Sequence, residues 1–212
     1  MRYDRLESCR ICPRLAAHLD QVRQAHPGYR CLPVGATGSV RAKLLMVGLA
    51  PGLHGANRTG RPFTGDASGT FLFAALARVG LASDADPLVA RLVGARLTNA
   101  VKCLPPQNRP NAAEMSACSR YLREEIDELW SPKVRSARCV LCLGRLAHRS
   151  VEIALGKRLP AFLHGQLCEV KPGLWLADSY HPSRQNTNTR RLTPEMLDSV
   201  LENVKGVVGL TG

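Results

Sequence analysis

The sequence predicts an α/β protein, because buried strands and amphipathic helices alternate along its 212 residues. Three observations lead to this prediction: short apolar runs recur between helical segments, a glycine-rich loop follows the first run, and polar side chains gather where strands end. A chain of this length can bury a sizeable core. We therefore expect a single domain over residues 1–212, beginning with a helical segment within residues 1–30.

The first strand and the loop after it are the segment around which the chain is organised. Residues 43–47 are an apolar run, and residues 47–70 contain six glycines before a helix expected over 67–79. Ligands of open α/β sheets bind beyond the carboxyl ends of the strands, so this loop is a candidate binding element. It has neither a GKT nor a GKS ending, which excludes a P-loop. Asp66 lies where the helix should begin, as a candidate N-cap.

The remaining elements repeat the same alternation. Asn111 and Thr193 precede two helical patterns as N-caps, and Pro194 suits a first helical position. With the first strand we count four strands in a mostly parallel sheet that has helices on both faces. Residues 32–39 are expected to be a linker. The other expected strands cover 96–101, 138–143 and 174–178, and the other helices cover 14–24, 112–130, 145–155 and 194–204.

Charge and hydropathy limit the class of protein. The chain has 29 Lys and Arg residues against 17 Asp and Glu residues, a formal charge of +12, which favours a polyanionic partner such as nucleic acid. No apolar run approaches the roughly 18 residues that a membrane span needs. The N-terminal residues have no apolar signal region, so we expect a cytoplasmic protein.

Eight cysteines in such a chain indicate metal binding or catalysis rather than disulfides. Cys139 and Cys142 have C-x-x-C spacing but lie on an expected strand, where their side chains point to opposite faces and belong to the core. The other candidate ligands combine one C-x-x-C pair with two distant cysteines, a set that suits an iron–sulfur cluster or a structural zinc. These four are Cys9, Cys12, Cys103 and Cys118.

Polar groups at the expected strand ends form a second constellation. Phe63 and Asp66 belong to the glycine-rich loop, Asn99 to the end of the second strand, and His181 to the end of the fourth. The carboxyl ends of parallel strands meet at one edge, so these four residues would place an aromatic face, a carboxylate, an amide and an imidazole together.

Four motifs in this order resemble the signature of the uracil-DNA glycosylase superfamily, over nearly the whole chain. They are GLAPG at 48–52, RPFTGD at 61–66, TNAVKC at 98–103 and HPS at 181–183. The four cysteines are similar to those of its iron–sulfur branch. Leu49, where family four carries an acidic residue, makes the chain most like family five, the B-type enzymes.

The resemblance implies a three-layer α/β/α sandwich with a four-stranded parallel sheet, and a structural [4Fe–4S] cluster on Cys9, Cys12, Cys103 and Cys118. It implies hydrolysis of the N-glycosidic bond of uracil in double-stranded DNA, and of other deaminated bases such as hypoxanthine, for base excision repair. The expected enzyme is a monofunctional monomer. Implied catalytic residues are Asp66 and His181; base-binding residues are Gly48, Ala50, Phe63, Asn99 and Asn186; DNA-binding residues are Ser183, Arg184, Arg190 and Arg191.

Several alternatives stay open at this point. Asp66 is either the residue that activates water or only a helix cap. The protein is alternatively a strict uracil enzyme like family four, or an iron–sulfur module that binds nucleic acid without catalysis. A third class is a nucleotide-binding protein stabilised by zinc. Brown colour with broad visible absorption separates iron–sulfur from zinc.

Overall fold

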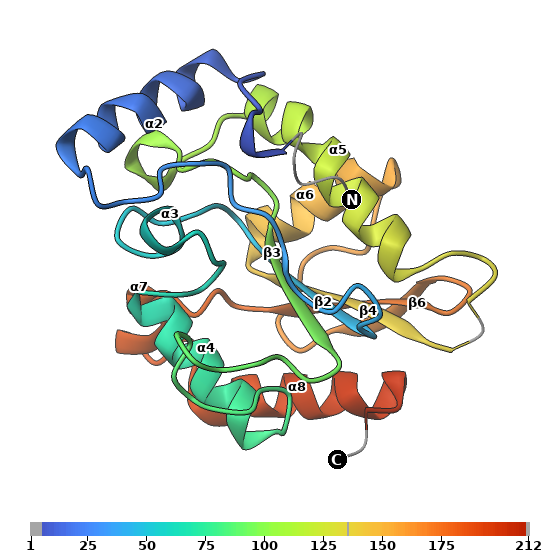
Figure 1. The fold of residues 1–212 in the computed structure, drawn as a ribbon. Coiled ribbons are helices and arrows are strands. Elements are labelled where there is room, and N and C mark those ends of the chain that lie inside the picture. The colour runs from blue at the N-terminus through green and yellow to red at the C-terminus, as the bar shows by residue number, and fades with distance from the viewer. Residues whose placement is uncertain (1–5, 135, 211–212) are drawn as a thin grey trace.

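The computed structural model describes residues 6–134 and 136–210, so the predictions for residues 1–5 lie outside the described part. Strands and helices alternate as the sequence predicts (Figure 1). The strands are β1 (Thr37–Gly38), β2 (Leu44–Gly48), β3 (Ala95–Asn99), β4 (Arg138–Leu143), β5 (Leu167–Lys171) and β6 (Leu174–Ser179). The helices are α2 (Pro13–Ala25), α3 (Ala56–Thr59), α4 (Ala67–Arg78), α5 (Ala112–Leu129), α6 (Arg145–Leu155), α7 (Arg184–Asn188) and α8 (Pro194–Val208), with a 3₁₀ turn, η1, at Pro106–Asn108.

The described strands form one sheet in the order β1-β3-β2-β4-β6-β5. The four central strands are parallel to one another and are the four that the sequence predicts. The prediction of a four-stranded sheet was nevertheless wrong, because β1 and β5 add antiparallel edges. β1 has only two residues and lies in the expected linker, and β5 mixes polar with apolar residues, so neither carries the signal of a buried strand.

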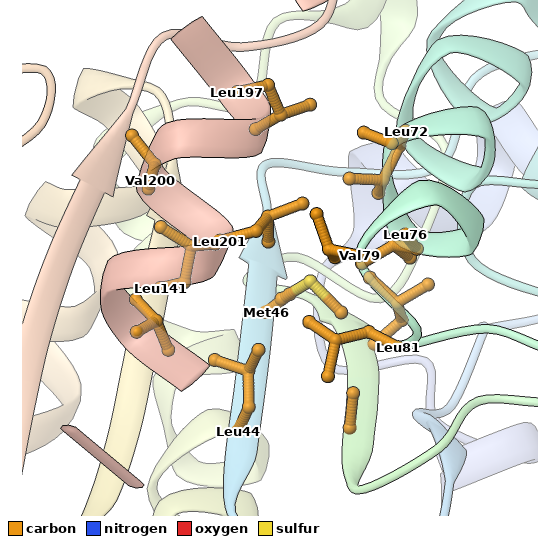
Figure 2. Close-up of a cluster of buried hydrophobic side chains, with 14 of the residues drawn as sticks. Leu44, Met46, Leu72, Leu76, Val79, Leu81, Leu141, Leu197, Val200 and Leu201 are labelled. Carbon is orange, nitrogen blue, oxygen red and sulfur yellow. The ribbon is translucent and has the colours of Figure 1, made fainter. Parts of the chain in front are cut away.

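Helices cover both faces of the sheet, giving the three layers that were predicted. Because side chains alternate along a strand, Leu44 and Met46 of β2 face α4 and α8, whereas Leu45 and Val47 face α5 and α6. Figure 2 shows the first of these cores, where Met46 lies between side chains of α8 and side chains of α4. Cys139 and Cys142 fall in opposite cores, which confirms their prediction as core residues.

The N-terminal segment lies against the loop after β2. The Arg30 backbone N–H donates to the Arg58 carbonyl at 3.2 Å, and the Cys31 N–H donates to the Asn57 carbonyl at 3.1 Å. The Tyr29 hydroxyl lies 2.8 Å from His54 Nδ1. These bonds join the segment that follows α2 to α3 and the residues just before it, although α2 and α3 are about 30 residues apart in sequence.

Three predicted helix caps are present. Asn111 forms a capping box with Glu114, and the Thr193 side chain accepts from the Met196 N–H. Asp66 is the N-cap of α4. None of the described helices combines the length and apolar character needed to cross a bilayer.

Candidate active site

A cleft of about 680 Å³ lies at the carboxyl ends of the parallel strands. It is bounded by the loop between β2 and α4, by the end of β3, and by the segment after β6. Among the predicted site residues, those that line it are Ala50, Phe63, Asp66, Asn99, His181, Ser183 and Arg184. Residues from all three distant segments therefore meet in one place.

Phe63 and Asn99 approach each other across Gly48. A Cβ atom on Gly48 would lie 2.5 Å from Asn99 Oδ1 and 2.7 Å from Phe63 Cζ, so only glycine fits between them. Phe63 adopts a left-handed φ of 53°, and its ring lies 6.1 Å from the His181 ring. Gly48 is not itself among the residues that line the cleft, but its lack of a side chain lets the aromatic ring and the amide converge.

The two carboxylate oxygens of Asp66 face different groups. Oδ1 accepts a hydrogen bond from the Gly69 N–H at 2.9 Å and caps α4. Oδ2 lies beside Gly52 and Gly55, two glycines that line the cleft; a Cβ on Gly55 would come within 2.1 Å of it. Capping therefore uses one oxygen and leaves the other beside the cleft, so the cap and catalyst roles are compatible.

Asn186 and Gly144 fix the position of His181. Its backbone carbonyl accepts a hydrogen bond from Asn186 Nδ2 at 2.8 Å, and its Cβ packs against Gly144. Burial lowers the pKa of the imidazole, and the nearby Asp66 carboxylate partly opposes this shift. The side chain is therefore neutral at pH 7.

The basic segment after His181 divides into two parts. Ser183 caps α7 and lines the cleft together with Arg184. Arg190 and Arg191 are exposed and lie outside the cleft lining, and the Arg191 guanidinium stacks 4.6 Å above the Tyr180 ring. Asn186 also lies outside that lining, and its side chain supports the His181 backbone instead.

The four predicted ligand cysteines line a second, smaller cavity between the N-terminal segment, the end of β3 and α5. Burial and the neighbouring thiols raise the pKa of Cys103 to about 12 and that of Cys118 to about 11. Four soft thiols that face one cavity and disfavour each other's ionisation fit a bound cationic metal centre. Ala50 packs against this group and also lines the cleft, so the two sites share a wall.

Another group of side chains is compact enough to hold a metal ion. Among the described residues, Cys142, His148 and Asp178 offer ligand atoms that all lie within 4.8 Å of one another. The Asp178 carboxylate there already contacts His148 Nδ1 at 2.9 Å and accepts from Gln166 Nε2 at 2.6 Å, which accounts for that buried group as a hydrogen-bonded network.

His54 and Asn108 are among the cleft residues that the sequence did not predict. His54 lines the cleft and pairs with the Tyr29 hydroxyl, and Asn108 reaches it from η1. His54 lies inside the glycine-rich loop, so its position in the loop was an available signal. Asn108 follows two prolines and has a left-handed φ of 56°, and nothing in its local sequence indicates a cleft residue.

Comparison with known proteins agrees with this geometry. Residues 36–205 match the family model of the uracil DNA glycosylase superfamily. The chain is 45% identical to a type-5 uracil-DNA glycosylase of Thermus thermophilus, over 97% of this chain and 96% of the relative. It is 42% identical to a type-5 enzyme of Pyrobaculum aerophilum (97% and 92% covered) and 31% identical to a type-4 enzyme of that organism (73% and 74% covered). The chain therefore belongs to the uracil DNA glycosylase superfamily, and its relatives support the type-5 branch.

Proposed function

We propose that this protein is a monofunctional DNA glycosylase that hydrolyses the N-glycosidic bond of uracil in DNA. The observation that supports it most is the convergence of Phe63, Asn99, His181 and Asp66 on one cleft. Relatives named uracil-DNA glycosylases cover nearly the whole chain, which supports the same activity.

The target nucleotide must leave the duplex before its glycosidic bond can be reached. In the cleft, the Phe63 ring would stack on the flipped base, and the Asn99 amide would both donate to and accept from its Watson–Crick edge. Gly48 and Ala50 would complete the pocket, since larger side chains at Gly48 collide with Asn99 and Phe63.

Bond cleavage places negative charge on the base and positive charge on the sugar. His181, neutral at pH 7, would donate a hydrogen bond to the departing base at uracil O2. Asp66 Oδ2 would orient water or stabilise the cationic sugar, because Leu49 offers no carboxylate for this step. The Asp66 carboxylate is held by its capping bond to Gly69, which restricts its motion.

The absence of a lysine from the described cleft lining supports hydrolysis without a Schiff base. Lys102 is the lysine next to Asn99 and Cys103 in sequence, but its ammonium is buried and bonded to three other groups. We therefore propose that the enzyme leaves intact abasic sites.

We also propose that the substrate is double-stranded DNA and includes hypoxanthine, because no acidic side chain at Leu49 restricts the pocket. Ser183, Arg184, Arg190 and Arg191 would contact the phosphate backbone beside the flipped base, and the charge of +12 favours such contacts. Base excision repair by a cytoplasmic monomer is the cellular role that follows.

We propose that Cys9, Cys12, Cys103 and Cys118 hold a [4Fe–4S] cluster. The shared cavity and the soft donor set both support this. The cluster would serve as a structural cross-link between the N-terminal segment, β3 and α5, and would take no part in base release.

The test is release of base from labelled duplexes that carry uracil or hypoxanthine, followed by alkali to cut abasic sites. Strand cleavage only after alkali is the expected result, and the ratio between the two bases measures how broad the pocket is. No release of either base by intact, brown protein would refute the glycosylase assignment. Release of uracil alone would refute the broad pocket.

Replacing Gly48 with alanine is expected to slow base release by about 10- to 100-fold, because the new Cβ displaces Asn99 and Phe63 from the base. Gly206→Ala is the matched control: Gly206 lies in α8, and a Cβ added there would meet nothing within 4 Å, so activity should stay unchanged. Single-turnover release at saturating enzyme measures both variants. Equal rates for Gly48→Ala and the native protein would contradict this account of the pocket.

Acidification is expected to destabilise the protein partly through His181. Its folded pKa is depressed, so between that value and about 6.5 the unfolded chain takes up a proton that the folded chain does not. This contribution to stability is present above about pH 6.5 and is lost as the pH falls. Melting temperatures at about pH 7.5 and about pH 5.5, on either side of the ordinary histidine pKa, should differ less in His181→Gln than in the native protein. Burial also lowers the pKa of His164, so His164→Gln is measured alongside.

A further inference from the structure

A buried ion pair lies next to the end of β3. Lys102 and Glu125 are both fully buried, and the lysine Nζ lies 2.8 Å from each oxygen of the Glu125 carboxylate. Glu125 belongs to α5, so the pair connects this helix to the segment that follows β3.

The ammonium group also bonds to the strand that carries Asn99. Lys102 Nζ donates to the Asn99 carbonyl at 2.7 Å and to Thr98 Oγ1 at 2.7 Å. An ammonium has three N–H donors, and here each has an acceptor: one carbonyl, one hydroxyl and one carboxylate. The charge-assisted bond to the carbonyl fixes the peptide unit from which the Asn99 side chain extends into the cleft.

The Lys102 bond adds to the backbone pairing at the end of the strand, where the Ala100 N–H of the same peptide unit donates to the Gly48 carbonyl at 2.9 Å. Asn99 is the last residue of β3, and its register partner Gly48 is the last residue of β2. Immediately afterwards the chain turns toward the cysteines, and the Lys102 N–H donates to Cys118 Sγ at 3.3 Å. Lys102 therefore lies between Asn99, which would read the base, and the cavity lined by the four cysteines, here called the thiol cavity.

We propose that Lys102, held by Glu125, is a positioning residue that fixes Asn99 for base recognition. This inference rests on the proposed function, since it assigns Asn99 the task of reading the base. Lys102 does not itself line the cleft. Its effect on base release passes through the Asn99 carbonyl.

The energetics of buried charge are consistent with the Lys102–Glu125 pair positioning Asn99 rather than stabilising the fold. Replacing a buried ion pair by apolar side chains of similar size is often neutral or stabilising, whereas removing one partner alone is strongly destabilising. The informative change therefore removes both charges at once. Lys102→Met with Glu125→Met preserves much of the volume and removes the donor to Asn99.

A second ion pair on α5 supplies a matched control. Arg96 of β3 and Glu128 of α5 form a largely buried ion pair with an N–O distance of 2.7 Å. This pair also joins α5 to the chain around β3, but it lies at the far end of β3 from Asn99, whereas Lys102 lies in the segment after the strand. Arg96→Met with Glu128→Met therefore perturbs the same packing without touching the base-reading residue.

Uracil release is measured under single-turnover conditions for the native protein, both double variants, and each of these in an Asn99→Ala background. We expect the Lys102/Glu125 variant to be about 10- to 100-fold slower when Asn99 is present, and to add no further loss when Asn99 is alanine. The Arg96/Glu128 control should keep the native rate. Melting temperature and visible absorption report whether each protein is folded and carries its metal centre.

Losses that add up in the Asn99→Ala background, an equal loss in the control, or a native rate in the Lys102/Glu125 variant would each overturn the inference. If the methionine variant does not fold, Lys102→Gln with Glu125→Gln is put through the same cycle, because a neutral amide cannot serve all three acceptors. Failure of the native protein to release uracil would instead overturn the proposed function, so the two failures are distinguishable.

Discussion

Asp66→Asn is expected to slow base release by about 10²- to 10⁴-fold while leaving the melting temperature nearly unchanged. Asn and Asp are similarly good N-caps, so the side-chain oxygen that accepts from the Gly69 N–H is retained. What the substitution removes is the negative charge on the oxygen beside Gly52 and Gly55. The prediction is checked by single-turnover release of uracil together with thermal unfolding.

Two further measurements separate the cap from the catalyst. Asp66→Ser also keeps a capping oxygen and should lose activity as Asp66→Asn does. Thr193→Ala removes the cap of α8 and should lower stability by about 1 kcal/mol without slowing the chemistry. Native activity in Asp66→Asn would mean that Asp66 is only a cap and that the water is activated by another group. Binding to uracil-containing duplex DNA should change little in either Asp66 variant.

Cys118→Ser is expected to abolish the broad visible absorption of the purified protein and to lower its melting temperature by at least about 5 °C. Serine keeps the size of the side chain and an acceptor for the Lys102 N–H, but its hydroxyl is a poor ligand for iron. Loss of the metal centre would release the N-terminal segment from β3 and α5, and metal binding of this kind contributes directly to folding. Visible spectra, iron content and thermal unfolding measure the effect.

Cys168→Ser provides the matched control. Cys168 lies in β5, is only half-buried, and packs near the core between the sheet and α5 and α6, away from the thiol cavity. Its variant should stay brown and retain its iron. A Cys118→Ser protein that keeps iron and colour would contradict the assignment, and a colourless native protein containing zinc would replace the cluster with a zinc site.

Local patterns were sufficient to predict the central architecture. Three of the four parallel strands contain continuous apolar runs, whereas β3 mixes polar with apolar residues. The caps at Asp66, Asn111 and Thr193 combine a capping side chain with a following helical pattern. The edge strands could not be predicted in the same way. β1 has two residues and depends on pairing with β3, and such pairing is a property of the folded chain.

The site was predictable to the level of residues but not of atoms. Strand ends meet at one edge of a parallel sheet, which is why Phe63, Asn99 and His181 could be grouped in advance. In Asp66, Oδ1 caps α4 while Oδ2 lies beside the cleft. This arrangement depends on a side-chain torsion that the local sequence does not determine. The bond from Lys102 to Asn99 could not be predicted either. Lys102 is held by Glu125, which lies 23 residues further along the chain.

The bonds between α3 and the segment that follows α2 have a consequence for local unfolding. Since the Arg30 and Cys31 N–H groups donate to carbonyls of α3, the cleft loop cannot open there without breaking bonds to the N-terminal segment. The two segments should therefore exchange their amide hydrogens as one cooperative unit, with a shared opening free energy. The glycine-rich loop is therefore as rigid as a packed element. This wall of the cleft is held in place by Arg30 and Cys31, which are distant from it in sequence.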